Sequence, residues 1–297
     1  MVNKKYLLMM VLLFLLGNVA SVKAKSAGEC GAIGLKFPPT ARAMGMGEAL
    51  VAVGDDINVL YFNPAGLAGI DKEFSSYYQD GVLDRFYTCF AYSQPVNIGG
   101  LGLSLGWLDG GEATIYEFDG TERELNALKD IYLQAGLGRI LKENLKVGGG
   151  IKIISSKLAE EYNASGIGID LGLLVEKNGK NVGISLQNLG LGLKYEDKKS
   201  SLPTTLRIGG AIRPGGRHFI LALEGKKVLG EGFSLGVGSE YWYQGFLALR
   251  LGYKTGNENQ GIAGGFGIRY QRFQFDYAFV PIKDLDSAHR ISLLLRF

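Results

Sequence analysis

The sequence predicts an all-β fold: a single antiparallel transmembrane β-barrel of about 14 strands that follows an N-terminal plug segment. Three observations predict it, namely apolar residues at every second position from residue 72 onward, connections that sort into short and long ones, and a high glycine content. Successive side chains of a strand point to opposite faces, so Leu101, Leu103 and Leu105 share an apolar face while Gly102 and Ser104 face the other side. A soluble sandwich alternates too, but runs of about 9–11 residues match a tilted bilayer crossing.

Fourteen alternating runs give an even strand number, as bacterial barrels require. We expect strands at 72–79, 84–94, 99–109, 127–141, 145–157, 163–177, 180–194, 203–213, 217–226, 232–243, 246–255, 260–270, 273–281 and 288–297. One run changes parity across Gln187-Asn188, where a β-bulge would absorb the extra residue.

The connections between these runs differ systematically in length. Short ones fall at 95–97, 143–144, 178–179, 215–216, 244–245 and 271–272, and longer charged ones at 110–126, 157–163, 195–202, 226–231, 255–260 and 281–288. Because antiparallel strands reverse direction at each connection, all short turns lie at one end and all long loops at the other. Barrels of the bacterial outer membrane have short periplasmic turns and longer external loops. The sequence therefore predicts location in the bacterial outer membrane, with outer-membrane lipid as a partner.

Composition narrows the function. The chain holds 45 Gly in 297 residues, about twice the usual share. Glycine weakens strands, so this content fits strands that curve tightly around a crowded lumen. The formal charge is +3. Since Lys4, Lys5 and Lys23 fall in the expected export signal, the remaining chain is close to neutral. It has no basic field for nucleic acid, and none is expected as a partner.

The two ends of the chain carry export and assembly signals. Residues 1–24 form the expected signal peptide, with a charged start, an apolar run over 7–16 and a small-residue cleavage site at 22–24. The apolar run is too short to span a membrane. At the other end, Ile291, Leu293, Leu295 and Phe297 share one face. This terminal strand resembles the signal read by the outer-membrane assembly machinery, which is a second expected partner.

Residues 25–70 do not alternate and are expected to form the plug, ahead of the barrel at 71–297. Their motif residues are Ala41, Arg42, Gly45, Gly47, Asp55, Asp56, Asn63, Pro64, Ala65 and Gly66. This pattern resembles the N-terminal segment of the PorV/PorQ branch of the FadL-like outer-membrane barrels. The resemblance implies a plug folded inside the barrel, where a polar lumen satisfies an irregular backbone.

The resemblance also implies a function. PorV-like barrels take part in type IX secretion, which would make secreted cargo or secretion-channel proteins partners of this chain in handling exported proteins. The alternative is a FadL-like channel for hydrophobic small molecules, and a third reading is a structural barrel without a solute path. The external loops are longer than the periplasmic turns, but they are charged and short compared with those of FadL-like transporters. This favours the first reading.

If the apolar face points to lipid, the other face lines the lumen. The charged lumen residues would be Lys146, Lys152, Asp170, Arg207, Glu224, Glu240, Arg250, Arg269 and Asp276. Because both signs occur, we expect ion pairs that hold the plug through Arg42, Asp55 and Asp56, rather than a selective lining of the kind that rings of charge provide. Most of the aromatic residues toward strand ends are expected to form interfacial girdles, and the alternative role is stacking against a ligand. These residues are Tyr77, Tyr78, Phe86, Tyr92, Trp107, Tyr241, Trp242, Tyr243 and Tyr253.

Catalytic and metal-binding patterns are absent from the sequence. His218 and His289 have no Cys or His partner at metal spacing, so neither a zinc site nor another cofactor is expected. No nucleophile–base pattern indicates an enzyme. Cys30 and Cys89 leave two alternatives, a disulfide that pins the plug to the wall or two separate thiols.

Overall fold

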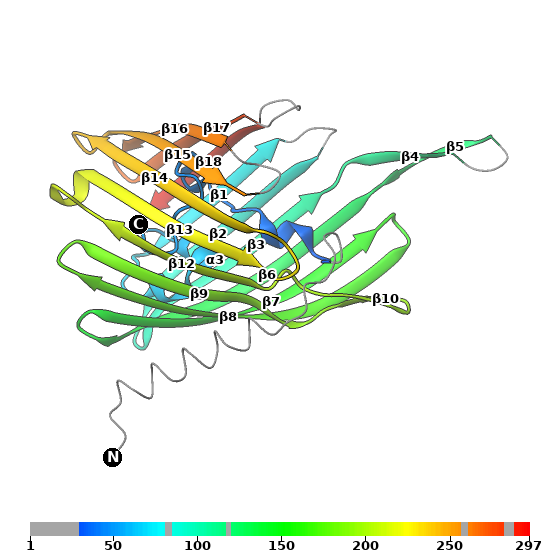
Figure 1. Cartoon of the computed structure of the whole chain (residues 1–297), viewed down its shortest axis with the longest axis horizontal. Helices are drawn as coiled ribbons and strands as arrows, with labels where there is room; N and C mark the ends of the chain where they lie inside the picture. The colour runs from blue at the N-terminus through cyan, green and yellow to red at the C-terminus, as the bar shows by residue number, and fades with distance from the viewer. Residues whose placement is uncertain (1–29, 81–84, 117–119, 257–260, 282–287) are drawn as a thin grey trace, which may run out of the picture.

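The described part of the protein is a closed, antiparallel β-barrel of 14 strands (Figure 1). The computed structural model describes residues 30–80, 85–116, 120–256, 261–281 and 288–297. The expected signal peptide at 1–24 lies outside the described residues, as does the start of the expected plug. The predicted fold class is therefore confirmed for the barrel.

The wall strands follow one another in chain order, and β1 closes the barrel against β18. Their bounds are β1 Glu73–Asp80, β2 Phe86–Val96, β3 Gly99–Asp109, β6 Leu128–Lys142, β7 Leu145–Leu158, β8 Tyr162–Lys177, β9 Lys180–Leu191, β12 Thr205–Ile212, β13 Phe219–Val228, β14 Phe233–Tyr243, β15 Leu247–Thr255, β16 Gly261–Tyr270, β17 Phe273–Val280 and β18 Ala288–Arg296. Two small hairpins leave the wall: β4 Glu112–Tyr116 with β5 Glu122–Asn126, and β10 Leu193–Tyr195 with β11 Lys198–Ser200.

The strand that was expected to run over 180–194 ends earlier. β9 stops at Leu191, and the chain turns away into the β10–β11 hairpin. The expected bulge is confirmed, because Ile169 pairs with Leu189 whereas Leu171 pairs with Leu186. Gln187 and Asn188 of β9 thus oppose the single residue Asp170 of β8, and Asn188 takes the left-handed conformation with φ of 57°.

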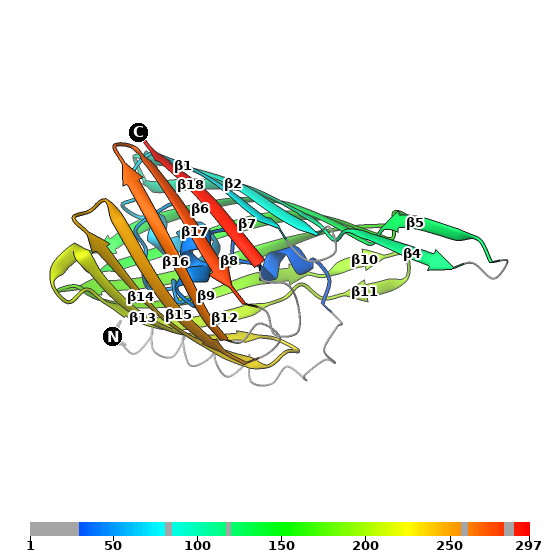
Figure 2. The ribbon, with the colours of Figure 1, turned by 90° about the horizontal axis from the view of Figure 1, so that it is seen from above.

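The two ends of the barrel differ as the connections predict (Figure 2). The β4–β5 and β10–β11 hairpins project from one end, which we call the long-loop end. Two-residue turns such as Asn178-Gly179, with both residues in the left-handed region, lie at the other, short-turn end. The turn at 159–161 is shorter than expected, because Ala159 and Glu160 also adopt positive φ. By the rule for outer-membrane barrels, the short-turn end is periplasmic.

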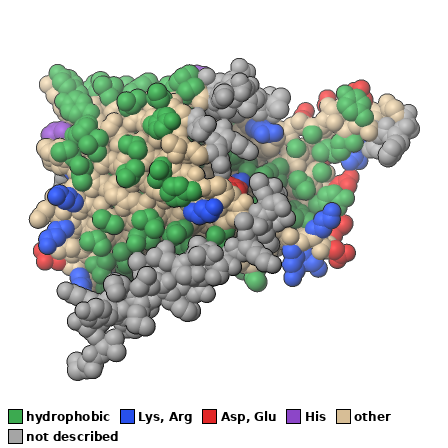
Figure 3. Space-filling view, viewed as in Figure 1, with side chains coloured by type: hydrophobic (Ala, Val, Ile, Leu, Met, Phe, Trp, Pro, Cys, Tyr) green, Lys and Arg blue, Asp and Glu red, His purple; other side chains and the backbone are tan. Residues whose placement is uncertain are grey.

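The outer wall is covered with apolar side chains (Figure 3). Members from around the barrel include Phe90, Leu105, Leu133, Ile153, Ile169, Val182, Leu223, Val237, Leu251 and Leu293, all exposed. Their chain neighbours point inward and are mostly small or polar. A soluble protein does not expose so continuous an apolar surface, so the wall is built to face lipid. No helix within the described ranges is long and apolar enough to cross a membrane.

The described residues 30–70, which we call the inner segment, lie inside the barrel (Figure 1, blue). They form four short helices: η1 Ile33–Lys36, α2 Ala41–Gly45, α3 Val59–Phe62 and η2 Pro64–Leu67. The backbone of Cys30 pairs with that of Ser201 in an isolated β-bridge at the long-loop end. At the short-turn end, the carbonyl of Lys72 accepts a hydrogen bond from the terminal Phe297 N–H. The segment therefore runs through the lumen from one end to the other.

Lumen-facing glycines allow the inner segment to touch the wall backbone to backbone. A Cβ added to Gly252 would lie 2.1 Å from the amide nitrogen of Gly47, and one on Gly148 would lie 2.3 Å from the carbonyl carbon of Pro64. Real Cβ atoms do not approach so closely, so a side chain at either position would displace the segment. This close approach explains the glycine content that the sequence shows.

Candidate functional site

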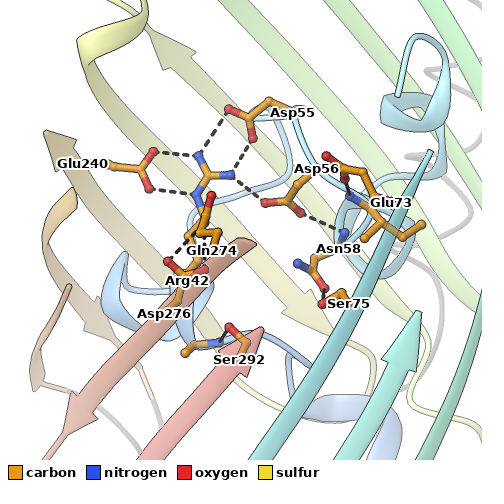
Figure 4. Close-up of polar contacts among 12 residues, drawn as sticks. Arg42, Asp55, Asp56, Asn58, Glu73, Ser75, Glu240, Gln274, Asp276 and Ser292 are labelled. Atoms are coloured by element: carbon orange, nitrogen blue, oxygen red, sulfur yellow. Dashed lines mark hydrogen bonds and ion pairs between the residues drawn. The ribbon is translucent and has the colours of Figure 1, made fainter. Parts of the chain in front are cut away.

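The inner segment is held most strongly at Arg42, on α2 (Figure 4). Its guanidinium donates five hydrogen bonds to three carboxylates. Nε and Nη2 form a fork on Glu240 of β14 at 2.8 and 2.7 Å, while Nη1 reaches Asp55 at 2.6 Å and Asp56 at 2.7 Å. A bidentate arginine–carboxylate pair fixes both distance and orientation, so Arg42 ties the inner segment to the wall in one position.

The Arg42 cluster extends into the wall. Arg250 of β15 donates to the same Glu240 at 2.7 Å and lies 2.7 Å from Asp276 of β17. Arg213 approaches Asp55 at 3.4 Å. With Arg42, these groups set three positive charges against four negative ones. Removing Arg42 would therefore leave a clear excess of buried negative charge.

A second set of ion pairs holds the turn after α2. Glu48 has a backbone φ of 65°, and its carboxylate accepts hydrogen bonds from Lys226 at 2.9 Å and Lys254 at 2.6 Å. Close by, one oxygen of Glu224 accepts from the Leu50 and Val51 amides, at 3.0 and 2.8 Å. The other oxygen of Glu224 accepts from Arg207, so a buried wall ion pair also satisfies backbone amides of the inner segment.

The Asn-Pro-Ala-Gly motif docks the last turn of the inner segment. Asn63 accepts from the Ala65 amide and so caps η2, with Pro64 at the first helical position. Its side-chain amide donates to the carbonyls of Val51 and Leu173, each at 3.0 Å. Gly66 packs on Gly54 and Val59, where a Cβ would fall 3.0 Å from Val59. Of the remaining motif residues, Ala41 donates to Ser292, and Gly45 and Gly47 lie against the β15–β16 and β14–β15 walls.

The structure places the charged lumen residues named from the sequence as follows. Lys152, Asp170, Arg207, Glu224, Glu240, Arg250 and Asp276 are buried inside the barrel, each with an opposite charge as partner. Lys146 lies near the short-turn end and pairs with Glu176 at 2.6 Å. Arg269 lies 4.2 Å from the centre of the Trp242 ring, as a cation–π contact.

Two expectations about single residues are corrected. Tyr77 and Trp242 are not girdle residues, because both are buried and face the lumen. Trp242 shares its parity with the lumen residue Glu240, so the alternation of β14 carried the information. The structure also contains no disulfide between Cys30 and Cys89. The Cys89 thiol contacts the Tyr132 hydroxyl at 3.7 Å, and that of Cys30 contacts the Leu229 carbonyl at 3.9 Å.

Uncharged polar side chains of the wall also hold the inner segment, and the sequence did not indicate these contacts. Gln134 donates to the carbonyl of Leu60, and Asn181 to that of Ala52. Gln187 donates to the carbonyls of Tyr61 and Phe62. Their inward parity is the signal that could have identified them.

A cavity opens at the long-loop end beside the start of the inner segment. It measures about 990 Å³ and is lined by Cys30, Gly31, Ala32, Ile33, Leu128, Leu158, Tyr162 and residues 195–200. Tyr195, one of the lining residues, donates to Ser156 at 2.6 Å. Ser156 in turn donates to Asp130 at 2.5 Å, and the Gly34 amide donates to Asp130 at 3.0 Å. Partial burial raises the pKa of the Tyr195 phenol, so it remains a hydrogen-bond donor.

A second cavity of about 570 Å³ lies where the wall loses a strand pairing. β9 pairs with β12 only from Lys180–Ile212 to Gln187–Thr205, and beyond the bulge it pairs with β8 alone. The cavity is lined by Cys30, residues 190–192, Lys194, residues 199–202, Thr204, Leu229 and Gly230. The two cavities share Cys30, Lys199 and Ser200, so the inner segment begins between them.

Metal-binding and catalytic arrangements do not emerge from the parts of the chain that the structure describes. No group of three or more His, Cys, Asp or Glu side chains is placed there to hold a metal ion. The Nδ1 atom of His289 lies 2.7 Å from the Tyr277 hydroxyl on the outer wall. The charged clusters contact the inner segment through Arg42, Glu48 and Glu224.

Solved structures show the same fold. A FadL homologue of Pseudomonas aeruginosa superposes with a TM-score of 0.62 at 12% identity, covering 87% of this chain and 98% of that chain. The toluene transporter TodX of Pseudomonas putida gives a TM-score of 0.60 at 13% identity, covering 87% of this chain and 96% of that chain. No protein-family profile matches the sequence, and a search of curated proteins found no match. The chain is thus an outer-membrane β-barrel with a FadL-like fold, located in the bacterial outer membrane.

Proposed function

We propose that this protein is a FadL-like outer-membrane channel for small hydrophobic molecules, which enter at the cavity lined by Ile33, Leu128, Leu158 and Tyr162. The observation that carries the proposal is this cavity of about 990 Å³. Ligand pockets are typically 300–1,000 Å³ with mostly apolar walls and a few polar groups. Here the polar groups come from the β10–β11 hairpin, and Tyr195 is one of them.

The course of the chain supports uptake through this end. The inner segment begins between the two cavities, so a ligand there touches the element that fills the lumen. The β9–β12 hydrogen-bond ladder stops at Gln187 and Thr205, so the wall beside the second cavity is not fully hydrogen-bonded. A hydrophobic molecule could leave through such a gap into lipid without crossing the ion pairs deeper inside.

A direct binding measurement tests the proposal. The protein is placed in phosphatidylcholine nanodiscs, and binding of radiolabelled toluene and laurate is measured by equilibrium dialysis, with empty nanodiscs subtracted. Wild type should bind at least one of them. Leu158→Glu places a charge in the cavity and should weaken binding by about tenfold or more, because the carboxylate must lose water when an apolar ligand covers it.

The matched control is Tyr116→Glu on the β4–β5 hairpin, which is exposed outside the cavity. It adds the same charge and should leave binding unchanged. Binding no greater than that of empty nanodiscs, or equal binding by Leu158→Glu, would refute the proposal.

The second candidate is the PorV-like role in type IX secretion, handling exported proteins. Its support is the motif at 41–66 together with the way that segment fills the lumen. The spaces beside Arg42 and Glu48 are only about 10 Å³ each, and a barrel sealed in this way suits a protein that acts through its external loops. An affinity pull-down of the tagged protein from its native outer membrane, in mild detergent, tests it. Recovery of secreted cargo or secretion-channel subunits would favour it, and recovery of the barrel with an apolar ligand alone would favour the channel.

A further inference from the structure

Four basic side chains group on two adjacent hairpins at the short-turn end: Arg139, Lys142, Lys177 and Lys180, which we call the basic arc. All four are exposed. They flank the turns between β6 and β7 and between β8 and β9, and these four strands are consecutive in the wall. Figure 3 shows Lys and Arg side chains at this end of the barrel, on its left edge.

Three members of the arc sit on the outward, lipid-facing rows of their strands. Val175 and Val182 are exposed cross-strand partners on the outer wall, and Lys177 and Lys180 are the next pair on the same face. Arg139 continues the row of Leu133 on β6 in the same way. The apolar belt therefore ends in positive charge at the periplasmic boundary of the membrane.

Acidic residues do not balance this charge. Glu176 points inward and pairs with Lys146, and Glu143 is the one exposed acid on these two hairpins. Within the described residues, no salt bridge joins a member of the arc to a carboxylate. Lys177 and Lys180 also face each other directly in the register, and like charges in that position repel. An anion between them would remove the repulsion.

The position of the basic arc at the membrane boundary indicates which anion it binds. Long basic side chains at the edge of an apolar belt extend to the interface and keep their charge among headgroups. The exposed Ile140 and Leu141 lie between Arg139 and Lys142 and add an apolar contact. We infer that the basic arc binds the phosphate headgroups of anionic phospholipids in the periplasmic leaflet of the outer membrane. This site is separate from the cavities at the other end and does not depend on what they bind.

The test measures lipid selectivity of the full-length barrel. Native mass spectrometry counts lipids retained from mixed micelles of phosphatidylglycerol and phosphatidylcholine. Wild type should retain phosphatidylglycerol preferentially. The triple variant Arg139→Gln, Lys177→Gln, Lys180→Gln should lose about tenfold or more of that preference, since each basic residue near an anionic surface contributes on the order of 1 kcal/mol.

Two controls make the result specific. The triple variant Lys157→Gln, Lys194→Gln, Lys198→Gln removes the same charge from exposed positions at the long-loop end and should retain the preference. The double variant Lys177→Arg, Lys180→Arg keeps the charge and should retain it as well. The inference would be overturned if the first triple variant kept its preference for phosphatidylglycerol, or if the second triple variant lost it equally. Heat-modifiable migration in gels checks that each barrel is folded.

Discussion

Replacing Arg42 by Met should release the inner segment while the barrel stays closed. Arg42 is buried and satisfies three carboxylates. Without it, Glu240 keeps Arg250 and Asp55 keeps the longer contact to Arg213, but Asp56 loses its ion pair. The cluster is left with two positive charges against four negative ones.

The expected size follows from buried ion pairs in general. Breaking such a pair by removing one partner costs about 3–5 kcal/mol, because the other charge stays buried without compensation. At 1.4 kcal/mol for each factor of ten, the equilibrium favouring the seated segment falls by about 140-fold to 3,700-fold. The barrel ladder does not involve Arg42, so its closure should persist.

A cysteine behind α2 reports the release. Ala263 is buried in one apolar cluster with Ala41 and Met44, so Ala263→Cys, in a background of Cys30→Ser and Cys89→Ser, is covered while the segment is seated. Maleimide labelling should be at least about 100-fold faster when Arg42→Met is added, since the rate follows the open fraction. Labelling at the parent rate by a folded Arg42→Met barrel would refute the argument.

Arg123→Met is the matched control, because it breaks an exposed ion pair between Arg123 of β5 and Glu161 in the turn between β7 and β8. Exposed pairs contribute at most about 1 kcal/mol, and this one lies outside the barrel wall. Labelling of the cysteine should therefore stay at the parent rate in this variant.

Three further changes test other contacts. Gly252→Ala should also unseat the segment, because its Cβ would meet Gly47, whereas Gly264→Ala, whose Cβ would have its nearest neighbour at 4.0 Å, should not; the same labelling assay compares them. Asn188→Ala should lower the free energy of unfolding in urea by about 1–3 kcal/mol, because it removes one hydrogen bond from the buried Lys152 and another from the Pro203 carbonyl; an unchanged midpoint would contradict this. Phe297→Ala should reduce the amount of barrel in outer-membrane fractions if the terminal Phe is the assembly signal, and an equal yield on immunoblots would exclude that role.

The wall was predictable because lipid and lumen impose opposite requirements on neighbouring residues. Leu101 and Leu103 face lipid while Gly102 contacts the inner segment, so apolar residues recur at every second position of the sequence. The bulge at Gln187-Asn188 was visible for the same reason, as a change of parity. The end of β9 was not, because Leu193 keeps an apolar alternation after the strand has left the wall to pack in the core under the β10–β11 hairpin.

The site was predictable only in part. The sequence named Arg42, Asp55 and Asp56 and an inward-facing Glu240, but it gave no distance between segments that lie 198 residues apart. Glu48 escaped notice because its role depends on a left-handed turn that places it between two lysines of different strands. Pairings of this kind follow from barrel closure, which no local pattern encodes.

The closure between β1 and β18 has a consequence for the order of assembly. The inner segment is made before any strand, whereas the last strand must be present before the cylinder can shut. A finished cylinder with such tight glycine contacts would leave no room for threading the segment afterwards. The sheet must therefore close around the segment, so the inner segment serves as the template on which the wall folds.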